Sequence, residues 1–204
     1  VPSGQFTDVS DAEFDEICGK LDAANIKVSC FASALANWAR KITNPLEVDQ
    51  KDLERSIPRM KKLGTPFIRV MSWPNDGLDE DAWRDEAVKR MKALAKQAED
   101  GGVILALENC SGWASESAEH YARFFELVDS PALKAVYDTG NPAGHGHTNT
   151  WEWYEKAKPH IAYVHIKSHT GPNPKSGEPR MTFPDDPESD SKIPETLADL
   201  VKSG

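Results

Sequence analysis

Three side chains that can bind a metal ion or move a proton close three successive apolar segments of the chain. Glu108 ends L-A-L-E, Asp138 ends V-Y-D and His165 ends Y-V-H. Two carboxylates and one imidazole suit a divalent cation, and the absence of sulfur donors argues against a closed structural zinc site. We therefore expect these residues to bind a divalent metal, Mn²⁺ first, with Mg²⁺, Co²⁺ and Zn²⁺ as alternatives.

Each of the three residues also has an ordinary structural interpretation. Asp138 precedes T-G-N and would form a turn, Glu108 would be solvated at a strand end, and His165 would be a core histidine. Taken singly, these interpretations are the better ones. Equivalent positions on three successive segments are harder to obtain by accident, so the set favours a functional site.

The segments that position these residues alternate with amphipathic helices. The capping box S-D-A-E at Ser10 opens the first helix, and Pro58 should kink the second. Helices are predicted to begin at Ser10, Asp49, Asp79, Ser117 and Trp151, with a last one over 193–203. Strands are predicted over 26–31, 67–72, 103–108, 133–138 and 161–166, with a doubtful one at 180–183 inside the long loop 168–191.

Alternation of helices with short, almost wholly apolar strands predicts an α/β fold with a parallel sheet. The residues after Phe31 contain no glycine-rich phosphate turn, which disfavours an open doubly wound sheet and leaves the (β/α)8 TIM-barrel type. Chemistry gathers at the carboxyl ends of the strands in this fold. If Glu108, Asp138 and His165 point into the barrel, the residues that alternate with them, Leu107, Tyr137 and Val164, face the helices.

Composition sets limits on partners and compartment. The 204 residues carry a formal net charge of −9 and no long Lys/Arg cluster, which disfavours nucleic acid as a partner. We expect one domain over 1–204, no membrane span, and a small-molecule substrate. Three cysteines without metal-ligand spacing indicate a reducing compartment, so the expected location is cytoplasmic.

The series L-A-L-E-N, Y-D-T-G-N and Y-V-H-I-K-S, each after an amphipathic helix, resembles the xylose-isomerase-like TIM barrels. That family includes sugar isomerases, ketose 3-epimerases and inosose dehydratases. The resemblance runs from about residue 10 to residue 204, and it implies metal binding by Glu108, Asp138 and His165. Family members add a second glutamate on the last barrel strand.

The sequence departs from this family at both ends. Family barrels have a strand and helix before the segment that starts at Val1, and a strand carrying the second glutamate where this chain stops at Gly204. We therefore expect an incomplete barrel that is a fragment, a chain completed by partner chains, or a reduced form of the fold. Exposed strand edges would favour a homo-oligomer.

The resemblance implies a metal-dependent sugar isomerase or epimerase that removes a proton next to a carbonyl group and passes through an enediolate. Glu108 is the expected base as well as a metal ligand. The alternatives are an inosose dehydratase-type lyase and an inactive barrel that only binds a sugar, a polyol or a partner chain. The acidic charge disfavours the endonuclease branch of the same barrels. Expected substrate-binding residues are Lys167, Trp73, Trp113, Arg69, Asn109 and Asn141, whereas His145, His147, His169 and Cys110 receive no role.

Overall fold

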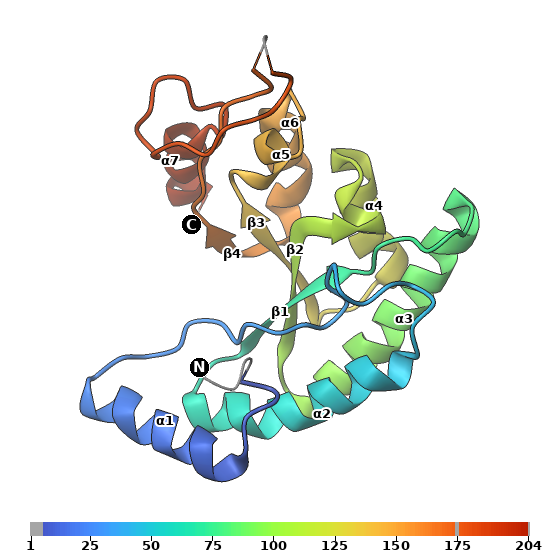
Figure 1. Ribbon diagram of the computed structural model, residues 1–204, viewed down its shortest axis with the longest axis vertical. Helices are drawn as coiled ribbons and strands as arrows, with labels where there is room; N and C mark the ends of the chain where they lie inside the picture. The colour runs from blue at the N-terminus through green and yellow to red at the C-terminus, as the bar shows by residue number, and fades with distance from the viewer. Residues whose placement is uncertain (1–5, 174–175, 204) are drawn as a thin grey trace.

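The structure of the chain, a computed structural model, describes residues 6–173 and 176–203. Four strands of these residues form one parallel sheet in the order β1-β2-β3-β4 (Figure 1). The strands are β1 (Phe67–Ser72), β2 (Ile104–Gly112), β3 (Leu133–Asp138) and β4 (Ile161–His165). The helices are α1 (Asp11–Ala23), α2 (Leu46–Leu63), α3 (Glu80–Gly101), α4 (Ala118–Val128), α5 (Asn141–Gly144), α6 (Thr150–Ala157) and α7 (Ile193–Ser203), with 3-10 turns η1 (Trp113–Ser115) and η2 (Lys158–His160).

A layer of helices covers one side of the sheet. Helix α2 packs on α3, α3 on α4, and α4 on α6, in the order in which Figure 1 shows them around the strands. Leu107 and Tyr137 point into this layer and lie in the main hydrophobic cluster. Burial of each such side chain contributes roughly 1.5–3 kcal/mol. The parallel α/β prediction is confirmed, and four strands make an incomplete barrel.

The helix starts follow local hydrogen bonding. The side chains of Ser10, Asp79 and Ser117 accept hydrogen bonds from the backbone N–H groups three residues on, as N-caps do. The predicted start of the second helix at Asp49 is wrong, because α2 already begins at Leu46 and contains Asp49 in its first turn. The Asp49 side chain bonds outside its own helix.

The expected strand over 26–31 is wrong except at its last residue. Phe31 forms a single parallel bridge to Ile68, in which its N–H donates to the Phe67 carbonyl at 2.8 Å. Ile26 is 57% exposed, whereas a strand inside a parallel sheet is buried on both faces, so the start of this segment does not belong to the sheet. The doubtful strand at 180–183 is likewise only an antiparallel bridge, between His169 and Met181. Within residues 6–173 and 176–203, the structure has four strands in place of the five or six expected.

Strand β4 forms one edge of the described sheet, since it pairs with β3 alone. Its five residues are all intermediate or exposed, whereas β3 has five buried residues out of six. The strand that carries His165 therefore has a strand partner on one side only in the described sheet.

Asp49 fastens the end of β1 to the helix layer. Its carboxylate is 2% exposed and accepts hydrogen bonds from the Ala36 N–H at 3.0 Å, from the Trp73 indole N–H at 2.8 Å and from Arg40 at 2.6 Å. Trp73 has a positive φ of 52°, which turns the chain just after β1. Asp49 of helix α2 therefore helps to fix the position of the carboxyl end of β1.

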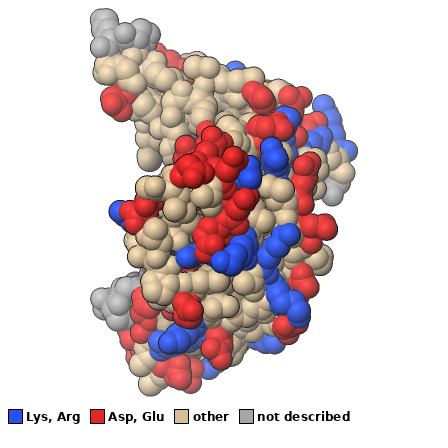
Figure 2. All heavy atoms as spheres, turned by 90° about the vertical axis from the view of Figure 1, so that its right-hand side faces the viewer, with Lys and Arg blue, Asp and Glu red and all other residues tan. Residues whose placement is uncertain are grey.

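Charged side chains of both signs share the face over α3 and α4. Figure 2 shows that basic groups on this face lie among acidic ones. Several of them are paired along α3, including Arg84 with Asp81 at 2.6 Å and Arg90 with Glu86 at 2.8 Å. This face therefore offers no continuous basic surface. Across residues 6–173 and 176–203, none of the helices combines the length and apolar character that crossing a membrane requires.

Candidate metal centre

Glu108, Asp138 and His165 converge at one edge of the sheet. Register places Asp138 beside His165, and Glu108 beside Val136 two residues before Asp138. His165 Nδ1 lies 3.3 Å from Glu108 Oε1 and 4.0 Å from Asp138 Oδ2. Within the described chain, one ligand atom from each residue lies within 4.8 Å of the others. Strand β2 continues past Glu108 to Gly112, so this glutamate does not end its strand as expected.

The two oxygens of the Asp138 carboxylate have different surroundings. Oδ1 accepts hydrogen bonds from the backbone N–H groups of Gly140 and Asn141, both at 2.9 Å. Oδ2 lies 3.5 Å from Lys167 Nζ and faces the His165 ring. Asp138 therefore forms the turn after β3 with one oxygen and leaves the other toward the cluster, so its two sequence interpretations are compatible.

Glu108 is a buried carboxylate with a free oxygen. The residue is 4% exposed, and Oε1 lies 3.3 Å from both His165 Nδ1 and Asn141 Nδ2. Oε2 lies 3.5 Å from Arg69 Nη1 and has no hydrogen-bond partner among the described residues. Burial pushes the pKa of Glu108 up, but the bond to His165 and the charges of Arg69 and Lys167 outweigh it and hold the pKa below its usual value. The group is thus ionised at neutral pH.

This donor set fits a divalent cation. A buried carboxylate oxygen without a hydrogen-bond partner normally needs a ligand or ion to offset its desolvation, and Glu108 Oε2 is such an atom. Carboxylate oxygens and an imidazole nitrogen are the ligands that Mg²⁺, Mn²⁺ and Zn²⁺ accept. Glu108, Asp138 and His165 could therefore hold a metal ion together.

Polar neighbours fix the cluster in place. Asn109 bridges β2 and β3, because its amide donates to the Asp138 carbonyl at 3.1 Å and accepts from the Asp138 N–H at 2.8 Å. Lys167 Nζ donates to Asn141 Oδ1 at 2.6 Å. Gly140 permits this packing, since a Cβ there would lie 2.7 Å from the Lys167 carbonyl oxygen. Arg69, Asn109, Asn141 and Lys167 thus surround the three candidate ligands.

The two tryptophans expected to line a substrate pocket lie in the core instead. Trp73 is fully buried, with its indole held by Asp49, and Trp113 is 2% exposed and stacks on His120 at 4.2 Å between ring centroids. The Trp73 side chain lies in the hydrophobic core, with its indole N–H bonded to Asp49 of α2. Neither ring offers a face to a substrate in this structure.

A cavity of about 710 Å³ beside the cluster is lined in part by residues to which the sequence analysis assigned no function. Cys110, His145 and His147 are among those that line it. Cys110 lies only two residues after Glu108 on β2, and this closeness in sequence could have placed it near the site. The histidines of G-H-G-H follow α5, and their position depends on how that short helix turns the chain. His169 packs instead against Gly144. A Cβ added at Gly144 would lie 3.2 Å from the His169 ring.

The thiols of Cys30 and Cys110 should react slowly in the folded protein. Burial raises the pKa of each to about 11. At pH 8 the thiolate fraction, and with it the labelling rate by a disulfide reagent, is expected to fall about 10²-fold below that of an unperturbed thiol. Peptide mapping after timed labelling, with the urea-unfolded chain as the reference, measures this. Equal rates in the folded and unfolded chain would contradict it.

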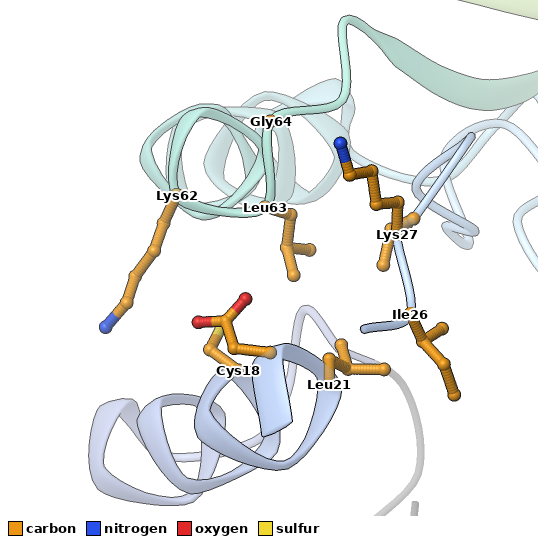
Figure 3. A pocket seen from close by; sticks show the side chains of 9 residues that line it. Cys18, Leu21, Ile26, Lys27, Lys62, Leu63 and Gly64 are labelled. Carbon is orange, nitrogen blue, oxygen red and sulfur yellow. The ribbon is translucent and has the colours of Figure 1, made fainter. Parts of the chain in front are cut away.

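A second cavity, of about 350 Å³, lies between α1 and α2. Figure 3 shows Cys18 and Leu21 on α1 facing Leu63 on α2, with Lys27 at the side. Leu63 and Gly64 come just before β1, so this cavity lies toward the amino ends of the strands, away from Glu108 and Asp138. It is not part of the metal centre.

Comparison with known proteins gives a consistent set of relatives. Residues 2–192 match the family model described as xylose isomerase-like TIM barrel. The 2-epi-5-epi-valiolone 7-phosphate 2-epimerase of an Actinoplanes species is 26% identical over 159 residues, which are 76% of this chain and 57% of that protein. This chain thus spans little more than half the length of that relative.

Solved structures share the fold. A xylose isomerase-like TIM barrel protein from Mycobacterium smegmatis in complex with magnesium superimposes with a TM-score of 0.66 at 21% identity, over 86% of this chain and 63% of that one. A D-tagatose 3-epimerase-like protein gives a TM-score of 0.64 at 18% identity, over 79% of this chain and 64% of that one. At these identities the likeness establishes the fold alone.

Proposed function

The chain belongs to the xylose isomerase-like TIM barrel family, and we propose that it contains the metal centre of a divalent-metal-dependent sugar isomerase or epimerase. The observation that carries this proposal is the convergence of Glu108, Asp138 and His165, with a buried Glu108 oxygen that has no hydrogen-bond partner in the described chain. The epimerase relative and the magnesium complex of a similar barrel support the same reaction class and cofactor type.

Glu108, Asp138 and His165 would hold the cation, which when bound supplies a Lewis acid that polarises the substrate carbonyl. Glu108 would also take the proton from the carbon next to that carbonyl, and the C–H electron pair would move toward the carbonyl oxygen to give an enediolate. Arg69 and Lys167 add positive charge where the oxygen becomes negative. Return of the proton by Glu108 to the former carbonyl carbon, with transfer of the neighbouring hydroxyl proton to the former carbonyl oxygen, would give an isomer. An epimer would need a proton delivered to the original carbon from the opposite face by a second acid, the role that the family resemblance gives to a second glutamate.

The first test is metal binding by an Asp138→Asn variant. The amide oxygen can still accept the Gly140 and Asn141 N–H bonds, so the turn is kept while a charged ligand is lost. We expect about one Mn²⁺ per wild-type chain and at least a tenfold lower affinity in the variant. Elemental analysis after dialysis measures the metal, and urea unfolding checks that the fold is retained.

Asp100→Asn is the matched control, because Asp100 is an exposed residue at the end of α3. It should bind Mn²⁺ as the wild type does. Undiminished Mn²⁺ in Asp138→Asn, or a wild-type chain that binds none, would count against the proposed centre.

A further inference from the structure

The 710 Å³ cavity, here called the β1–β2 cavity, opens at the ends of these two strands. Pro74 and Asn75 follow β1, and Cys110 to Gly112 end β2. Its full lining is Pro74, Asn75, Trp83, Cys110, Ser111, Gly112, Ser115, Glu116, His145 and His147.

The cavity adjoins the metal centre. Cys110 lies two residues beyond Glu108 on β2. Burial raises the pKa of Cys110, and the nearby charges of Glu108, Lys167 and Asp138 also act on this thiol. His145, another lining residue, is close enough to Asp138 and Lys167 to be affected by both. A ligand with one end at Glu108 can therefore extend into the cavity.

The lining offers hydrogen-bonding groups suited to hydroxyls. Among the described residues, no side-chain hydrogen bond engages the Glu116 carboxylate, the Ser111 hydroxyl or the rings of His145 and His147. A carboxylate accepts, a hydroxyl or neutral imidazole both donates and accepts, and sugar hydroxyls do both. Trp83 and Pro74 add apolar surface, which matches the C–H groups of a sugar.

The charges of the lining disfavour an anion. No lysine or arginine is present among the described residues that line the cavity, and Glu116 is a carboxylate. Burial, His147 and Lys167 lower the pKa of His145, so its ring is neutral at pH 7. Arg69 and Lys167 lie beside Glu108 and Asp138 and are not among the lining residues. A phosphate here would meet the Glu116 carboxylate, and no lysine or arginine of the described lining would pair with it.

We infer that the β1–β2 cavity binds the uncharged, hydroxyl-bearing end of the sugar whose carbonyl end lies at Glu108, and that it selects against sugars phosphorylated at that end. This inference rests on the proposed function and adds the substrate class to it.

The test compares D-fructose, D-tagatose and D-psicose with their 6-phosphates on the Mn²⁺-loaded protein. Calorimetry measures binding and product analysis measures kcat/KM. We expect at least a tenfold preference for the free sugars. Glu116→Lys replaces the like charge with an attractive one and should lower this preference at least tenfold. Glu126→Lys makes the same charge change on the exposed side of α4, outside the cavity, and should leave the preference unchanged.

The outcomes separate the two proposals. Turnover with equal or better use of the phosphates would overturn the cavity inference while supporting the proposed function. An unchanged preference in Glu116→Lys, with Mn²⁺ bound, would also overturn the cavity inference. A protein that holds Mn²⁺ but neither binds nor converts any of the sugars would overturn both.

Discussion

Glu108→Gln is expected to lower turnover of a ketose by about 10²- to 10⁴-fold, the usual contribution of a general base. The amide keeps the shape of the side chain and can still accept one hydrogen bond, but it cannot take a proton from carbon. It also removes the negative charge 3.5 Å from Arg69. Steady-state kcat with Mn²⁺ in excess, beside the Mn²⁺ content of the variant, measures the effect.

The two measurements separate two roles of Glu108. A variant that binds less Mn²⁺ but regains turnover at high Mn²⁺ has lost a ligand only. A variant that is saturated with Mn²⁺ and still inactive has lost the base. Glu126→Gln, an exposed change on α4, should keep full turnover. Near wild-type turnover of Glu108→Gln would place the base elsewhere.

Gly112→Ala is expected to lower the free energy of unfolding by about 3 kcal/mol or more. Gly112 has a φ of 91°, and a Cβ there would lie 2.2 Å from the backbone carbon of Ser72. Backbone cannot move aside as a flexible side chain can, so β1 and β2 would have to separate at their ends. The Ser72 hydroxyl, which donates to the Ser111 carbonyl at 3.0 Å and accepts from the Ala114 N–H, would lose this geometry.

Gly77→Ala provides the matched control for the Gly112 variant. Its φ is 87°, but nothing lies within 4 Å of an added Cβ. It should therefore show only the backbone strain, about 1 kcal/mol. Urea unfolding of both variants gives the difference, and similar losses in the two would contradict the role of the close contact with Ser72.

The sequence predicted the parts of this fold that depend on local pattern. Apolar strands between amphipathic helices gave the parallel sheet, and Ser10, Asp79 and Ser117 gave the helix starts. The convergence of Glu108, Asp138 and His165 followed from a general property of parallel sheets, whose carboxyl ends meet at one edge.

The parts that sequence reasoning missed depend on contacts between distant segments. The strand expected at 26–31 has the right residues, but among the described residues only Phe31 finds a ladder partner. From its position after β1, Trp73 was predicted to bind substrate, but its indole N–H is bonded to the buried Asp49 and its backbone has a positive φ. A positive φ at a tryptophan is rare, and no local sequence pattern predicts it.

The edge position of β4 has a consequence for motion. Glu108 and Asp138 stand on strands that pair with a neighbour on both sides, whereas His165 stands on a strand that pairs with β3 alone in the described sheet. The backbone amides of β4 should therefore exchange with solvent faster than those of β2 and β3. A cation shared by all three residues would join the edge to the interior strands and slow that exchange. Part of the free energy of metal binding would then go into ordering β4. Any contact that covers the free edge of β4 and orders it beforehand would therefore raise the affinity for the metal.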